Sequence, residues 1–202
     1  EVLIAITSRS ICRRPFLEQI GKVAEAGPEL MILREKDLPH EELVGLARDC
    51  LSICSGCGVP FSVNSDIAAA RELGIRRVHL PMDILRTADI RGFGLVGASV
   101  HSPEEAKEAE RLGAHYLIAG HVFPTACKIG EPRGTDFLRS VCSAVDIPVY
   151  GVGGIVPSNY HEVLDAGAAG AASMSSVMRA DDPSEIIEGM RPPVGAWGLL
   201  SR

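Results

Sequence analysis

Glycine- and serine-rich segments near the end of the chain have the composition of a phosphate-binding site. Gly153 and Gly154 follow one short apolar run, and Ser175 and Ser176 follow the next. Glycine lets the backbone approach an anion closely and turn its amides toward it. A short helix opening at the serines would direct further amides and hydroxyls at the same anion. Either segment alone is typical of a tight turn or a helix cap, but their matching positions predict a phosphate site.

Further polar side chains follow the other apolar runs, and they include cations and an amide. Such groups suit an anionic ligand, whereas a purely structural domain would keep long charged side chains in solvent. Any one of these residues alone is more often part of the surface, so their convergence is the informative observation. The set consists of Arg34, Lys36, Asn64, Ser99, His101 and Lys128.

Three cysteines have a spacing that also occurs at iron–sulfur clusters. Cys50, Cys54 and Cys57 form the C-x-x-x-C-x-x-C pattern of radical S-adenosylmethionine enzymes. The first two, however, continue the helical spacing of Leu43 and Ala47, which places them on one buried helix face. We therefore expect small core residues rather than cluster ligands, and reduced thiols in a domain that needs no disulfides.

The elements that carry these polar residues alternate between predicted strands and predicted helices. Short runs rich in Val, Ile and Leu are each followed by a turn and then by a segment with helical spacing. The predicted strands are Val2–Thr7, Leu30–Leu33, Phe61–Val63, Arg77–Leu80, Leu95–Val100, Tyr116–Ala119, Val149–Val152 and Ala168–Met174. The predicted helices are Phe16–Ala26, His40–Cys54, Ile67–Leu73, Pro103–Leu112, Thr135–Val145, Asn159–Ala166 and Pro183–Met190, with a weaker segment at Asp83–Ala88.

Eight strand–helix repeats predict an α/β chain that folds as a single (β/α)8 barrel, a TIM barrel, over residues 1–202. The carboxyl ends of the strands then meet at one end of the barrel, where the loops after the seventh and eighth strands commonly bind phosphate. An open doubly wound sheet is the alternative. Thr7–Ser10, after the first strand, does not have the G-x-G-x-x-G phosphate loop that would support it.

The composition excludes several classes of partner. Hydrophobic residues make up 46% of the chain, and the net charge of −6 comes from interspersed acidic and basic residues. Nucleic acid is not expected without a basic face. The apolar runs are far shorter than the roughly 18 residues that span a membrane, and no signal peptide is recognised. We therefore expect no membrane partner and a cytoplasmic location.

A longer set of motifs resembles a known superfamily over essentially the whole chain. The most distinctive segment is Gly120–Lys128, with the sequence GHVFPTACK. It is accompanied by Leu33–Lys36, Val78–Pro81, Ser99–His101 and Gly153–Ile155. Together these segments resemble the thiamine phosphate synthase superfamily. It has two branches, the synthases and the thiazole tautomerases of the TenI type.

The synthase branch differs from this chain at three positions. Synthases carry Gln before Leu-Arg-x-Lys, Asn-Asp where a magnesium ion is held, and Thr-x-Thr-Lys in the sixth loop. Here those positions are Ile32, Ser65 and Cys127. Asp83 remains as a second metal carboxylate, but alone it makes a poor magnesium site for a diphosphate substrate. The sequence therefore argues against pyrophosphate-releasing synthesis.

The TenI-type branch is the closer resemblance. It shares Gly-His-Val-Phe, Thr-x-Cys-Lys and a following Arg-Gly, which here are Gly120–Lys128 and Arg133–Gly134. The resemblance implies an isomerase, a thiazole tautomerase that moves one proton to aromatise a carboxylated dihydrothiazole ethyl phosphate, without metal or cofactor. It also implies that His121 is the catalytic acid–base, because an imidazole with a pKa of about 6.5 exchanges protons near neutral pH.

The same resemblance supplies expected binding roles. The phosphate loops would fix one end of the substrate, while Lys128 or Arg34 would neutralise its carboxylate. His101 is the reserve candidate for His121. The expected substrate-binding residues are Arg34, Lys36, Asn64, Ser99, Thr125, Lys128, Gly153, Gly154, Ser175 and Ser176. No chemistry is assigned to the remaining histidines, which are His40, His79, His115 and His161.

Two alternatives stay open at this point. A thiamine phosphate synthase would join hydroxymethylpyrimidine diphosphate to thiazole phosphate with release of pyrophosphate, and this reading alone would require Mg²⁺. A non-catalytic regulatory barrel would retain only the pocket for the phosphorylated thiazole. The family often dimerises, so a homodimer is one expected assembly.

Overall fold

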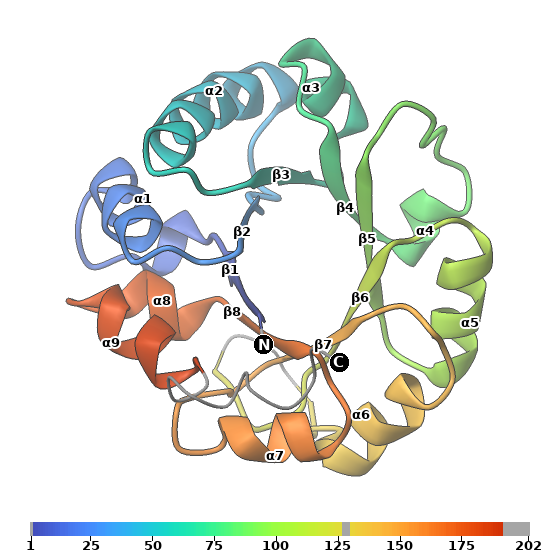
Figure 1. Ribbon diagram of the computed structural model, residues 1–202. Helices are drawn as coiled ribbons and strands as arrows, with labels where there is room; N and C mark the ends of the chain where they lie inside the picture. The colour runs from blue at the N-terminus through green and yellow to red at the C-terminus, as the bar shows by residue number, and fades with distance from the viewer. Residues whose placement is uncertain (1, 127–129, 192–202) are drawn as a thin grey trace, which may run out of the picture.

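A closed barrel of eight parallel strands forms the centre of the molecule (Figure 1). The computed structural model describes residues 2–126 and 130–191. Each strand pairs with the next along the chain, and the last pairs with the first, with Ala5 opposite Ser173. This order confirms the predicted (β/α)8 barrel. The strands are β1 (Val2–Ile6), β2 (Leu30–Leu33), β3 (Phe61–Asn64), β4 (Arg77–Pro81), β5 (Leu95–Val100), β6 (Tyr116–Gly120), β7 (Val149–Val152) and β8 (Gly170–Ser173).

Helices surround the barrel on its outer side (Figure 1). Ser102 and Asp182 accept backbone N–H groups at the starts of two of them, each with proline as the next residue. None of the helices in the described residues is long and apolar enough to cross a membrane. They are α1 (Phe16–Glu25), α2 (His40–Gly56), α3 (Ile67–Glu72), α4 (Met82–Leu85), α5 (Pro103–Arg111), α6 (Gly134–Cys142), α7 (Tyr160–Asp165), α8 (Ser175–Arg179) and α9 (Pro183–Gly189), with the 3-10 helix η1 (Arg9–Ile11).

Some predicted boundaries differ from the observed ones. The predicted strand Ala168–Met174 is longer than β8, because β1 offers partners only from Val2 to Ala5. The predicted helix Thr135–Val145 is also too long, since α6 ends at Cys142. Beyond it, the backbone N–H groups of residues 146 and 147 donate to the carboxylate of Glu110, which turns the chain toward β7. The short helix expected at the serines is α8, whereas η1 was not predicted.

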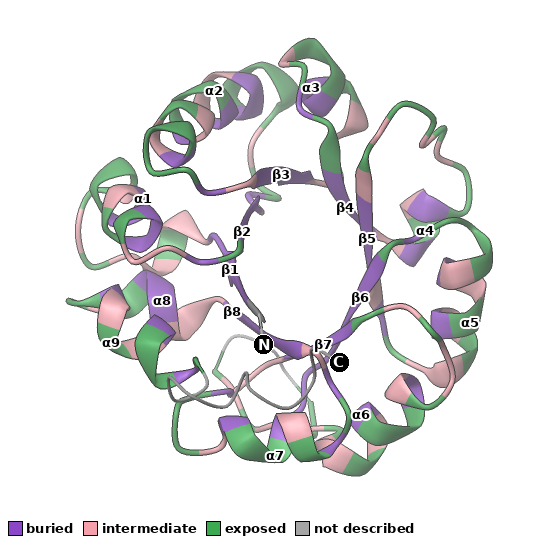
Figure 2. Cartoon of the chain, in the orientation of Figure 1, coloured by how far each residue is buried: buried purple, intermediate pink, exposed green. Residues whose placement is uncertain are grey.

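Two separate apolar cores lie inside and outside the barrel wall. Successive residues of a strand point to opposite sides, so Leu3 and Ala5 face the helices while Ile4 and Ile6 fill the barrel. Figure 2 shows the buried strands enclosed by helices whose outer faces are exposed. The inner core consists of Ile4, Ile6, Leu30, Ile32, Tyr116, Ile118, Tyr150 and Ala172.

The cysteines of α2 divide between the core and the surface. Cys50 and Cys54 are fully buried, as predicted for core residues, and the thiol of Cys54 lies 3.8 Å from the sulfur of Met31. Cys57 is exposed, so its interpretation as a core residue is wrong: it follows the last turn of the helix, where the buried face has ended.

Candidate active site

A cavity of about 410 Å³ opens at the carboxyl ends of the strands, and every strand or the loop after it contributes residues. Apolar side chains of the inner core, including Ile6, Ile118 and Ala172, form its floor. Lys128 lies outside the described residues. The other predicted site residues all line this cavity: Arg34, Lys36, Asn64, Ser99, His121, Thr125, Gly153, Gly154, Ser175 and Ser176. His101, the reserve candidate, lines it as well.

Arg34 and Lys36 bring positive charge to the cavity from the loop after β2. Within the described residues, neither forms an ion pair with a carboxylate. Their charges are therefore available to an anionic ligand.

A buried carboxylate, Glu35, holds this loop in place. It accepts a hydrogen bond from the hydroxyl of Thr7 at 2.8 Å and another from the backbone N–H of Arg9 at 3.0 Å. The backbone N–H of Arg34 in turn donates to the oxygen of Thr7 at 2.9 Å. Glu35 was not predicted from the sequence. Because alternate residues of an extended segment point to opposite sides, its position between Arg34 and Lys36 indicates that its side chain points away from the cavity.

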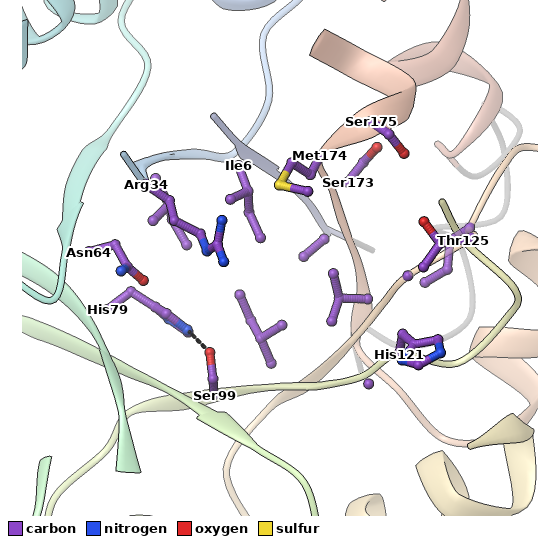
Figure 3. A pocket seen from close by; sticks show the side chains of 18 of the residues that line it. Ile6, Arg34, Asn64, His79, Ser99, His121, Thr125, Ser173, Met174 and Ser175 are labelled. Atoms are coloured by element: carbon purple, nitrogen blue, oxygen red, sulfur yellow. Dashed lines mark hydrogen bonds between the residues drawn. The ribbon is translucent and has the colours of Figure 1, made fainter. Parts of the chain in front are cut away.

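His79 belongs to the site, although no chemistry was expected of it from the sequence. It lines the cavity from β4, and one ring nitrogen, Nε2, lies 2.8 Å from Oγ of Ser99 (Figure 3). The other, Nδ1, lies 3.2 Å from the hydroxyl of Tyr116. Burial, and then the charge of Arg34, lower the pKa of His79 to about 3, so the ring is neutral at physiological pH.

His121 is buried in the cavity wall directly after β6. Its Nε2 lies 3.3 Å from the carbonyl oxygen of Gly130. Nδ1 has no hydrogen-bond partner among the described residues. The backbone around His121 is fixed, because its carbonyl accepts the N–H of Arg133 at 2.9 Å and the N–H of Phe123 donates to Gly153 at 3.0 Å.

Close packing explains the glycine pair after β7. Gly153 and Gly154 have φ angles of +99° and +65°, in the left-handed region that favours glycine. A Cβ on Gly153 would lie 2.8 Å from the Cα of His121, and one on Gly154 would lie 2.8 Å from the Cβ of Phe123. Both glycines line the cavity, but the loop after β6 already requires their small size. The hydroxyl of Ser176 donates to the carbonyl of Ile155 at 3.2 Å and so ties the loops after β7 and β8 together.

The described residues do not fit a magnesium ion. The described cavity lining contains no Asp or Glu side chain. Ser65 accepts the side-chain amide of Asn64 at 2.7 Å, and Asp83 is exposed in the first turn of α4, outside the lining. Nowhere in the described parts of the chain do three His, Cys, Asp or Glu side chains gather as a metal site. Because Mg²⁺ is usually bound through one or two carboxylates, we assign no step to it.

Comparisons with known proteins show the family of this chain. A family model described as thiamine monophosphate synthase matches residues 3–177. A thiamine-phosphate synthase of Moorella thermoacetica is 36% identical over 201 residues, covering 96% of this chain and 95% of that protein. One from Listeria monocytogenes is 40% identical over 156 residues, 73% of each protein. The solved structure of a thiamine phosphate pyrophosphorylase from Pyrococcus furiosus matches with a TM-score of 0.82 at 33% identity, covering 94% of this chain and 93% of that chain.

These names contradict the expectation of a thiazole tautomerase, so that interpretation and the isomerase class are wrong. They agree with the synthase alternative. The segment that favoured the tautomerase, Gly120–Lys128, has a packing role in its described part. A Cβ on Gly120 would lie 2.8 Å from a methyl carbon of Val152, and the N–H of Val122 donates to the carbonyl of Val152 at 2.9 Å. Residues needed for contact with β7 do not by themselves identify the reaction.

Proposed function

The chain belongs to the thiamine monophosphate synthase family, and we propose that within this family it acts as a thiamine-phosphate synthase. It is an enzyme of thiamine biosynthesis. The proposed reaction joins hydroxymethylpyrimidine diphosphate to thiazole phosphate and releases pyrophosphate, which makes the enzyme a transferase. Similarity to a protein of that name over 96% of the chain supports this proposal.

The structural observation that carries the proposal is a cavity with polar groups on two sides of an apolar floor. Arg34, Asn64 and Ser99 gather on the side formed by β2 to β5 (Figure 3). Thr125 and Ser175 lie on the side formed by β6 to β8 (Figure 3). Two anionic substrates need two such polar regions, with their rings between them over the apolar floor.

The chemistry requires positioning and charge stabilisation more than proton transfer. The thiazole nitrogen attacks the methylene carbon of the pyrimidine with its lone pair, and the bond from that carbon to the diphosphate oxygen breaks. The electron pair leaves on pyrophosphate, so negative charge develops on the leaving group. Arg34 and Lys36 stabilise that charge. The amides of Gly153 and Gly154 hold the thiazole phosphate, so that its nitrogen approaches the carbon in the correct orientation.

His121 has a different role in this proposal from the acid–base role expected of it. It lies with Thr125 in the wall on the β6 to β8 side. In this proposal it would contact the thiazole phosphate there. A thiazole nitrogen that attacks with its own lone pair requires no base.

A coupled assay tests the proposal. The protein is mixed with both substrates, with added Mg²⁺ and in parallel with a chelator, and thiamine phosphate and pyrophosphate are quantified. We expect equimolar products, and we expect Arg34→Gln to lower kcat/KM by about 10- to 100-fold, as for a lost charged hydrogen bond. Arg48→Gln, at an exposed position of α2, is the matched control. Binding of both substrates without product in either buffer would overturn the proposal in favour of the regulatory barrel.

A further inference from the structure

Three polar side chains from adjacent strands form a hydrogen-bonded series between the barrel interior and the cavity. Tyr116 of β6 contacts His79 of β4, and His79 contacts Ser99 of β5, over distances of 3.2 and 2.8 Å. Tyr116 and His79 are buried, whereas Ser99 is half-buried and lines the cavity. Ser99 is therefore the member of the series that a ligand in the cavity can contact.

Gly97 allows this contact to form across an intervening strand. It is paired in register with both His79 and Tyr116. A Cβ on Gly97 would lie 2.5 Å from Nδ1 of His79 and from a ring carbon of Tyr116. Only a residue without a side chain leaves room for the two rings to meet.

The positions of the protons follow from the available partners. The buried hydroxyl of Tyr116 has Nδ1 of His79 as its only hydrogen-bond partner in the described residues, and burial raises the pKa of this tyrosine, which keeps its proton. A buried O–H without an acceptor is unfavourable, so Tyr116 donates to Nδ1. The neutral imidazole then carries its proton on Nε2 and donates to Oγ of Ser99.

Ser99 is left with a hydroxyl hydrogen that His79 does not accept. Arg34 lies close enough to His79 to influence it electrostatically, and it points into the same side of the cavity as Ser99 (Figure 3). A hydroxyl donor and a guanidinium on one side of a cavity suit a diphosphate oxygen.

We propose that His79 is a positioning residue that, through its contact with Tyr116, holds the hydroxyl of Ser99 as a donor to the substrate diphosphate. The inference rests on the proposed function for the identity of that anion. Independently of the ligand, the inference states which tautomer His79 adopts: its proton lies on Nε2. With the proton on Nδ1 instead, the hydroxyl of Tyr116 would have no acceptor.

Nitrogen-15 NMR of the ligand-free protein tests this tautomer independently of activity. We expect the long-range couplings of His79, assigned by comparison with His79→Gln, to show the Nε2–H form at neutral pH. In Tyr116→Phe we expect the Nδ1–H form to appear, while Tyr150→Phe, at another tyrosine of the inner core, leaves the spectrum unchanged. An Nδ1–H form in the wild type would overturn the inference.

Calorimetry with pyrophosphate, and assays of turnover, test the consequence for the ligand. Ser99→Ala and Tyr116→Phe should each weaken pyrophosphate binding and lower kcat by about fivefold to tenfold, the effect of one hydrogen bond. The amide of His79→Gln can occupy the Nε2 position and donate to Ser99, whereas that of His79→Asn cannot, so Gln should retain more activity. Thermal unfolding of each variant identifies effects of misfolding.

The outcomes separate the two proposals. If Ser99→Ala is folded and binds pyrophosphate as tightly as the wild type, the positioning role of His79 is wrong. If synthase turnover is absent but the tautomer and the loss of pyrophosphate binding are as expected, the proposed reaction fails and the inference is supported.

Discussion

The hydroxyl of Thr7 donates a 2.8 Å hydrogen bond to the carboxylate of Glu35, which joins the end of β1 to the loop after β2. The same threonine oxygen accepts the backbone N–H of Arg34 at 2.9 Å. One small side chain thus fixes both the buried carboxylate and the backbone of a cation that lines the cavity.

Replacing Thr7 tests this connection. Thr7→Val keeps the shape of the side chain but leaves the backbone N–H of Arg34 without its hydrogen-bond acceptor and removes one of the hydrogen bonds to the carboxylate of Glu35. We expect the free energy of unfolding to fall by about 1–3 kcal/mol, as measured by urea denaturation. Thr87→Val, at an exposed position, should change it by less than about 0.5 kcal/mol. Equal effects of the two substitutions would contradict the structural role of Thr7.

The glycine pair after β7 gives a second prediction. Gly154→Ala adds a Cβ that would lie 2.8 Å from the Cβ of Phe123 and would also be strained by a φ of +65°. Gly58→Ala has a similar φ of +71° and nothing within 4 Å of the added Cβ, so it measures the backbone strain alone. We expect about 1–2 kcal/mol of destabilisation for Gly58→Ala and clearly more for Gly154→Ala. Denaturation curves that coincide would show that the loop after β6 moves aside freely.

His40 should make stability depend on pH. Its hydrogen bond to Asp66, and then the charge of that carboxylate, raise the pKa of His40 above its ordinary value of 6.5. A raised folded-state pKa contributes stability that is fully present below the unfolded pKa and is lost as pH rises through the folded pKa. His40→Gln should remove this dependence, whereas His161→Gln, at an exposed position of α7, should not. Unfolding measured from pH 5 to 9 checks this, and identical profiles for wild type and His40→Gln would refute it.

The cysteines of α2 should differ in reactivity. Cys57 is exposed, whereas burial raises the pKa of the Cys50 and Cys54 thiols and keeps reagents away from them. A thiol reagent followed by peptide mass spectrometry should modify Cys57 within minutes and leave the other two intact until denaturant is added. Rapid modification of Cys50 in the native protein would mean that α2 opens readily from the barrel.

The barrel could be predicted from the sequence because each strand is a short apolar run followed by a turn and a helical segment. In such a barrel the polar residues after the strands must meet at one end of the barrel. The cavity there contains all the predicted polar residues that the structure describes. His79 was missed although Val78 and Leu80 belong to the outer core, so a period of two already points His79 inward. Glu35 was harder to predict, because its partner Thr7 lies 28 residues away and becomes a neighbour only in the barrel.

The reaction was the least predictable part. The choice between the two branches of one superfamily rested on the short segment around His121 and on the differences from the synthases at Ile32 and Ser65. That segment includes Gly120, which must be small to pack against Val152 whatever reaction the cavity performs. The homodimer and the site roles stay predictions.

The pairing of β8 with β1 has a consequence for how the protein is made. Cavity residues extend from Ile6 to Ser176, so the site is complete only when the last strand joins the first. During synthesis, Arg34 and Lys36 leave the ribosome well before β8, so the chain cannot form the complete site until β8 has been made. A ligand that binds only the closed ring opposes opening at the junction of β1 and β8 and so stabilises the newly folded chain. Ligand binding and the stability of the closed barrel are thereby linked.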